Sequence, residues 1–112
     1  MKKILGVSLL IALCLNNPVH AQKNKTMIGK VMAFECGDNC YLTIVDEQGQ
    51  DHQALCSDTS VCDKIMNNID DPNLAGYKRK LVKATIGQGK QFDGAGNVMG
   101  TMDAFIKIQL LK

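Results

Sequence analysis

The sequence contains no tryptophan, and its other aromatic residues are only two tyrosines and three phenylalanines. Proteins that bind single-stranded nucleic acid stack bases on aromatic side chains along a basic groove. Basic residues are not in excess either. Without Lys2 and Lys3, which lie in the N-terminal segment described below, 11 lysines and arginines balance 11 aspartates and glutamates. This composition argues against nucleic acid and anionic lipid as partners.

Histidine is also scarce, since His52 is the only one after residue 20. No nucleophile lies near His52 in its predicted strand, and no paired carboxylates have the spacing of a catalytic site. The cysteine spacing lacks the Cys-x-x-Cys motif of thiol–disulfide oxidoreductases. The sequence therefore predicts a protein that is not an enzyme and that uses no cofactor.

Residues 1–21 have the pattern of a secretory signal peptide. Two lysines precede an apolar run at residues 4–15, which is too short to span a bilayer. Val19-His20-Ala21 then supplies the small residues of a cleavage site. We expect cleavage after Ala21, export to the periplasm or beyond, one mature domain at residues 22–112, and no transmembrane span.

Four cysteines follow the predicted cleavage site, at positions 36, 40, 56 and 62. In a small exported domain they are expected to form two disulfides. Residues that flank a three-residue turn have Cα atoms about 5.5 Å apart, which suits a disulfide. This favours Cys36–Cys40 with Cys56–Cys62 over the crossed pairing of Cys40–Cys56 with Cys36–Cys62. A zinc site built from all four thiolates is the alternative, although the spacing of the second pair is wider than usual.

Residue patterns predict five strands and one short helix. In the first strand, Ile28, Met32 and Phe34 are expected on one face, with Val31 and Ala33 on the other. Closely spaced glycines predict either a long loop or an excursion of the hairpin at residues 87–100. The strands are expected at residues 26–36, 41–46, 51–56, 77–86 and 102–111, and the helix at residues 60–69.

Three strands, a helix and two further strands form the element order of the OB-fold, a five-stranded Greek-key barrel. The predicted fold class is therefore all-β with one short helix, in a closed barrel that removes exposed strand edges. An open α+β sheet with one helix on its face is the alternative.

Several motifs carry a resemblance to known proteins. They are Gly29-x-Val31, Cys36-Gly-Asp-Asn-Cys40-Tyr-Leu, Asp46-x-x-Gly49, Cys56 and Asp93-Gly-Ala-Gly-Asn97-x-x-Gly100. On these motifs the chain resembles a group of small exported, periplasmic bacterial OB-fold proteins of uncharacterised function. The resemblance spans most of residues 22–112. It implies the fold and the compartment but no activity, because the motifs are structural.

OB-folds bind ligands on the face of their second and third strands, between the loops that join strands one to two and four to five. We therefore expect a disulfide-stabilised module that recognises an envelope or extracellular protein, peptide or glycan. The oligomeric state is left open. The expected ligand-binding residues are Asp38, Asn39, Tyr41, Thr43, His52, Lys90, Gln91 and Phe92.

A periplasmic metal-binding protein is the alternative function. Zinc would use the cysteines, and copper would use methionine and histidine, which are ligands suited to soft metals. Met99 and Met102 are close in sequence, but His52 lies in a different predicted strand. No metal-binding residues are therefore assigned.

Overall fold

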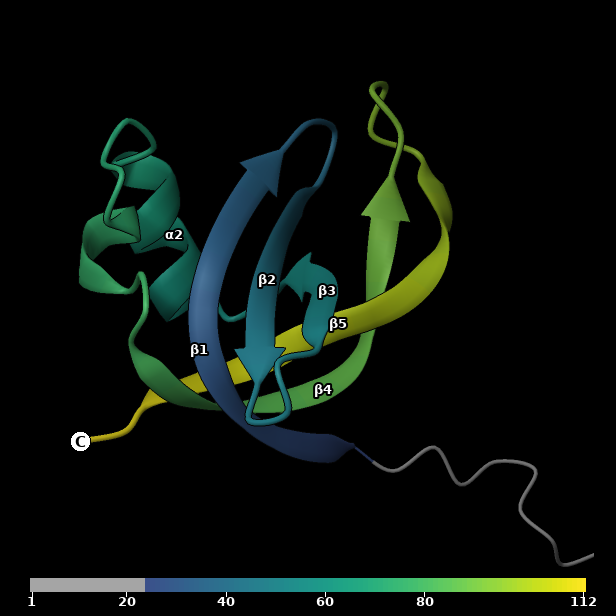
Figure 1. The fold of residues 1–112 in the computed structure, drawn as a ribbon. Coiled ribbons are helices and arrows are strands. Elements are labelled where there is room, and N and C mark those ends of the chain that lie inside the picture. Colours follow the sequence, from purple (N-terminus) through teal and green to yellow (C-terminus); the bar gives the residue numbers. More distant parts are fainter. Residues whose placement is uncertain (1–23) are drawn as a thin grey trace, which may run out of the picture.

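The computed structural model describes residues 24–112, so the predicted signal peptide and its cleavage site lie outside the described residues. The described chain is mostly β, with one short α-helix between the third and fourth strands, as predicted (Figure 1). The elements are β1 (Lys25–Cys36), β2 (Cys40–Asp46), β3 (Asp51–Cys56), α2 (Thr59–Asn67), the 3₁₀ turn η1 (Leu74–Gly76), β4 (Leu81–Phe92) and β5 (Val98–Leu110). None of the helices in this part of the chain has the length and apolar character needed to cross a membrane.

The five strands form a closed barrel in the order β1-β2-β3-β5-β4, and β4 pairs with β1 to complete it. All pairs are antiparallel except β3 and β5, which join through only Leu55↔Ala104 and Cys56↔Phe105. Closure agrees with the prediction of a barrel and excludes the open sheet for the described residues. Because β3 and β5 share only these two residue pairs, the two strands separate on one side of the junction.

The β4–β5 hairpin extends well beyond the barrel. β1 pairs with β4 only as far as Ile86, and β3 meets β5 only from Ala104 onwards. Residues 88–92 and 98–103 therefore pair only with each other. We call this two-stranded segment the arm. In Figure 1 it rises on the opposite side of the barrel from α2.

Of the two alternatives predicted for residues 87–100, the structure shows the excursion of the hairpin and not the long loop, because β4 and β5 continue through most of this segment. The glycines allow close packing here. A Cβ on Gly89 would lie 2.9 Å from the Ala104 Cβ and 3.0 Å from Leu55 Cδ1. The fourth strand also begins later than expected, at Leu81, because η1 and the turn after it occupy residues 74–80.

The barrel interior is filled by apolar side chains from all five strands and from α2. A register shift between Val31 and Ala33 marks a bulge at Met32, which has no partner on β2. Val31 is fully buried before the bulge, and Phe34 packs on the core after it. The predicted faces of the first strand are therefore wrong, because the bulge changes the alternation. The fully buried large side chains are Val31, Leu42, Ile44, Ile65, Val82 and Phe105.

Asp58 fixes the start of α2 to the barrel. Its Oδ1 accepts hydrogen bonds from the Ser60 N–H at 3.1 Å and the Ser60 hydroxyl at 2.6 Å, and its Oδ2 accepts from the Ile108 N–H at 2.7 Å. Burial alone would raise the pKa of Asp58, but these hydrogen bonds outweigh it and lower the pKa. One carboxylate thus caps the helix and holds it against β5.

Gly29 on β1 is a position where the barrel has no room for a side chain. A Cβ there would collide with the Val45 carbonyl and lie 2.8 Å from Ile44 Cγ2. We expect Gly29→Ala to lower the free energy of unfolding by about 2 kcal/mol, because backbone must move to relieve the overlap. Urea denaturation would measure this. Gly37→Ala is the control, since a Cβ on Gly37 meets nothing within 4 Å. Equal losses for the two variants would contradict the prediction.

Candidate functional site

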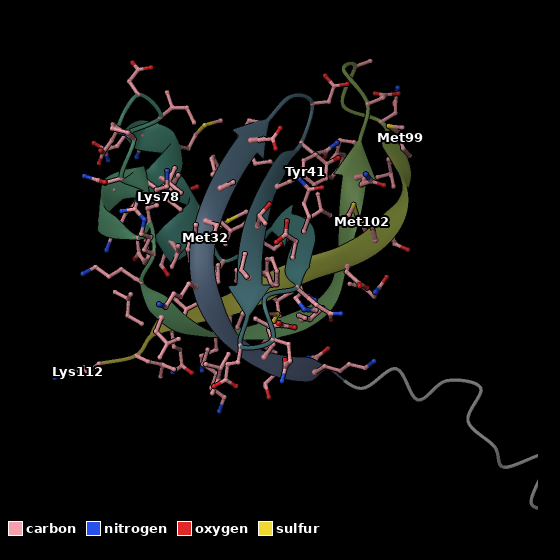
Figure 2. The ribbon with its side chains drawn as sticks, viewed as in Figure 1. Met32, Tyr41, Lys78, Met99, Met102 and Lys112 are labelled. Carbon is pink, nitrogen blue, oxygen red and sulfur yellow. A yellow bond between two sulfur atoms is a disulfide. The ribbon has the colours of Figure 1, made fainter. Side chains whose placement is uncertain are left out.

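A shallow depression of about 570 Å³ lies on the outer face of β1, β2 and β3. Its middle row is formed by Ala33, Thr43 and Gln53, which are direct neighbours across the three strands. Met32, which precedes Ala33 on β1, is labelled in Figure 2. The full lining is Met32, Ala33, Glu35, Thr43, Val45, Asp51 and Gln53. The depression thus combines an apolar floor with hydroxyl, amide and carboxylate groups.

Two carboxylates, those of Glu35 and Asp51, border the depression. Both residues are exposed, and within residues 24–112 neither side chain forms an ion pair or a hydrogen bond. No lysine or arginine is among the lining residues. The lining residues therefore carry only negative charge, although the predicted mature chain has a net charge near zero.

The β1–β2 loop and the end of the arm are hydrogen-bonded to each other, and we call these two segments the rim. Asn39 Nδ2 donates to the Phe92 carbonyl at 2.8 Å, and its Oδ1 accepts from the Phe92 N–H at 2.9 Å. Gln91 Nε2 donates to the Tyr41 hydroxyl at 3.0 Å. The carboxylate of Asp38 lies near Gly94, where an added Cβ would be 3.5 Å from Oδ1. The structure thus brings together five of the eight predicted residues from two distant parts of the chain.

The other three predicted residues have different positions. Thr43 lies in the depression itself. Lys90 follows the strand alternation and lies on the opposite side of the arm from Gln91. His52 pairs with the fully buried Ile44 and shares its face of the sheet, not that of Thr43. His52 is therefore separated from the rest of the predicted set.

His52 is bonded to Asp46 at the far end of β2, with its Nε2 2.8 Å from Asp46 Oδ2. Asp46 Oδ1 also accepts from the Gln48 and Gln50 N–H groups, each at 2.9 Å. The hydrogen bond from His52, supported by these backbone bonds, holds the pKa of Asp46 below its usual range. This arrangement fastens the β2–β3 turn, and it engages the imidazole in a structural contact.

The four cysteines of residues 24–112 form disulfides in the predicted local pairing. Cys36 is bonded to Cys40 with Cα atoms 4.1 Å apart, and Cys56 to Cys62 with Cα atoms 5.9 Å apart. The thiolates required for the alternative zinc site are thus paired with each other. In the part of the chain that the structure describes, no group of three or more His, Cys, Asp or Glu side chains could hold a metal ion.

The copper alternative would need methionine and histidine side chains in one place. Figure 2 shows Met99 and Met102 on the arm. His52 lies instead at the β2–β3 turn, bonded to Asp46. The structure therefore does not bring these residues together.

The two Asn39 hydrogen bonds join the β1–β2 loop to the end of the arm, so we expect Asn39→Ala to release the end of the arm. The Phe92 N–H should then exchange with solvent about fivefold faster, because one hydrogen bond contributes about 1 kcal/mol. Hydrogen exchange followed by NMR would measure this. Asp38→Ala is the control, because its side chain forms no hydrogen bond within residues 24–112. Unchanged exchange at Phe92 in Asn39→Ala would refute the role of this contact.

Six lining residues were not predicted from the sequence: Met32, Ala33, Glu35, Val45, Asp51 and Gln53. Two of them, Asp51 and Gln53, lie on β3 opposite Val45 and Thr43. A strict count of alternate residues from Thr43 across the predicted hairpin could have found these two.

Comparisons with protein-family models, with curated proteins and with solved structures found no match to this chain.

Proposed function

We propose that this protein is an exported binding module with an OB-fold, which recognises an envelope or extracellular protein, peptide or glycan. The observation that carries the proposal is the depression on the outer face of β1, β2 and β3. The β1–β2 loop and the arm, which are hydrogen-bonded to each other, follow the same strands at the end marked by Glu35 and Tyr41. OB-folds use this face and these two connections for binding. The strand order, with α2 between β3 and β4, supports the OB-fold assignment.

Export is supported by two independent features. Residues 1–21 have the pattern of a signal peptide. The described domain contains two disulfides, which persist in oxidising compartments and are rare in the cytosol. A partner in the envelope or outside the cell follows from this compartment.

The chemistry of the lining favours binding over catalysis. It offers apolar contact through Met32, Ala33 and Val45, and hydrogen bonding through Thr43 and Gln53. Binding sites commonly combine an apolar floor with a few placed polar groups. The lining contains no histidine or cysteine that could act as a base or a nucleophile.

Thr43→Arg tests the proposal because it fills the centre of the depression with a long side chain. We expect chemical cross-linking of the exported protein to its partner to fall by about tenfold or more, which corresponds to a loss of at least about 1.4 kcal/mol. Cross-linked products would be identified by mass spectrometry of the envelope and culture medium. Thr85→Arg is the matched control, since Thr85 is also half-buried on a strand but lies on β4. Equal cross-linking of both variants would reject this face as the binding site.

A further inference from the structure

We infer that the ligand of the depression is an extended peptide segment with two basic side chains about four residues apart. This inference rests on the proposed function and specifies the class of partner. The evidence is the position of Glu35 and Asp51 at opposite corners of the depression.

The two carboxylates lack partners in the described part of the chain. The only ion pair there joins His52 to Asp46, which lies on the other face of β2. A charged group that is exposed beside an apolar floor can pair with a cationic ligand with little cost of desolvation. The same charges would repel nucleic acid and other polyanions.

The strand register gives the spacing of the corners. Glu35 pairs with Tyr41, which pairs with Leu55, four residues along β3 from Asp51. Neighbouring strands lie about 4.8 Å apart and rise about 3.4 Å per residue, so the two positions are separated by about 16 Å. In an extended peptide, side chains four residues apart lie on one side and are separated by about 13 Å. Flexible lysine side chains can span the difference.

The surface between the corners suits the residues between the two cations. Met32, Ala33 and Val45 offer apolar contact, and Thr43 and Gln53 offer hydrogen bonds. β3 also has a free edge beside the depression, because residues 51–54 pair with β2 but not with β5. A peptide that crosses the depression from Asp51 to Glu35 can hydrogen-bond to this edge through its main chain at the Asp51 end only. Main-chain hydrogen bonding at that end favours a peptide over a glycan.

The two corners are not equivalent. Lys30 pairs with Val45, the neighbour of Asp51, and the basic turn at residues 78–80 bonds to β1 at Val31. These cations lie toward the Asp51 corner and weaken the attraction there. Glu35, at the opposite corner, is therefore expected to contribute more to binding than Asp51.

A labelled synthetic peptide tests the inference. The probe is an extended Val/Thr peptide of about ten residues with two lysines four positions apart, and the control peptide has glutamine at both positions. Fluorescence anisotropy with the purified, disulfide-bonded protein should show saturable binding of the lysine peptide alone. Raising the salt concentration should weaken this binding, because the paired charges are exposed. Equal binding of both peptides, or no binding of either, would overturn the inference.

Charge-neutral variants then test the site. Glu35→Gln should raise the Kd by about fivefold, and Asp51→Asn by about twofold, within the range for exposed ion pairs. Glu47→Gln is the matched control, because Glu47 is exposed in the β2–β3 turn and outside the depression. Unchanged affinity in the double variant Glu35→Gln/Asp51→Asn would also overturn the inference.

The cross-linking assay separates this inference from the proposed function. If Thr43→Arg abolishes cross-linking to the natural partner and the double carboxylate variant does not weaken it, the binding face stands and the cationic peptide is rejected. If the double variant weakens cross-linking together with Thr43→Arg, both are supported. If Thr43→Arg has no effect, both fail. Identification of a neutral glycan as the captured partner would likewise reject the peptide.

Discussion

Replacing Phe105 with alanine is expected to lower the free energy of unfolding by about 4 kcal/mol. Phe105 is the largest of the fully buried side chains, and it packs in the core cluster with residues from the barrel and α2. Its backbone pairs with Cys56 on β3 and Ile86 on β4, and its carbonyl accepts from the Ser57 N–H at 3.0 Å. The ring therefore fills the interior at the narrow β3–β5 junction.

Loss of the ring would leave a cavity that this junction cannot easily close. Small domains have a total stability of only about 5–15 kcal/mol, so a loss of this size would partly unfold the protein at 37 °C. Urea denaturation followed by circular dichroism would measure the change. Ile106→Ala is the control, because the adjacent Ile106 is 37% exposed and should cost about 1 kcal/mol or less. Similar midpoints for the two variants would show that Phe105 does not have this central role.

The barrel could be predicted from the sequence because its main features depend on local patterns. Residue patterns marked the first three strands and the helix that became α2, although the bulge changed the faces of the first strand. The local disulfides followed from the short turn between Cys36 and Cys40. Each of these signals comes from residues close together in the chain.

The sequence could not decide between a loop and a hairpin excursion at residues 87–100, and it did not indicate the bulge, because both features depend on contacts between distant residues. Gly89 packs against Leu55 and Ala104, so its lack of a side chain reflects packing and not a loop. The bulge at Met32 is visible only in the pairing of β1 with β2. Without it, the sequence alternation assigned Val31 and Phe34 to opposite faces, although both contact the core.

The candidate site likewise combines features that follow from nearby residues with features that depend on contacts between distant residues. Its location near Tyr41, Thr43 and the loop residues was predicted, but the function of individual side chains was not. Asn39 and Phe92 are 53 residues apart, and only the folded chain shows that they hydrogen-bond to each other. A side chain chosen as a ligand contact thus turns out to hold the rim together.

The second large effect is expected from loss of the Cys56–Cys62 disulfide. Closing either short loop contributes about 2 kcal/mol in the chain-entropy model, so loop length hardly distinguishes the two bridges. Burial does. Cys62 is 7% exposed within the core cluster, and Cys56 packs against that cluster, whereas Cys36 is exposed. Removing the inner bridge therefore also removes packed sulfur, and this adds about 1 kcal/mol.

We therefore expect Cys56→Ala/Cys62→Ala to lose about 3 kcal/mol of unfolding free energy, and the matched variant Cys36→Ala/Cys40→Ala to lose about 2 kcal/mol or less. The Asn39 contacts to Phe92 still hold the β1–β2 loop in the second variant, which limits its loss. Urea denaturation of both oxidised variants would measure the difference. A greater loss from the outer bridge would mean that the β1–β2 loop, and not the connection from β3 to α2, is the critical staple. If the order is as expected, the Cys56–Cys62 bridge stabilises the barrel, and the Cys36–Cys40 bridge mainly shapes the rim of the binding face.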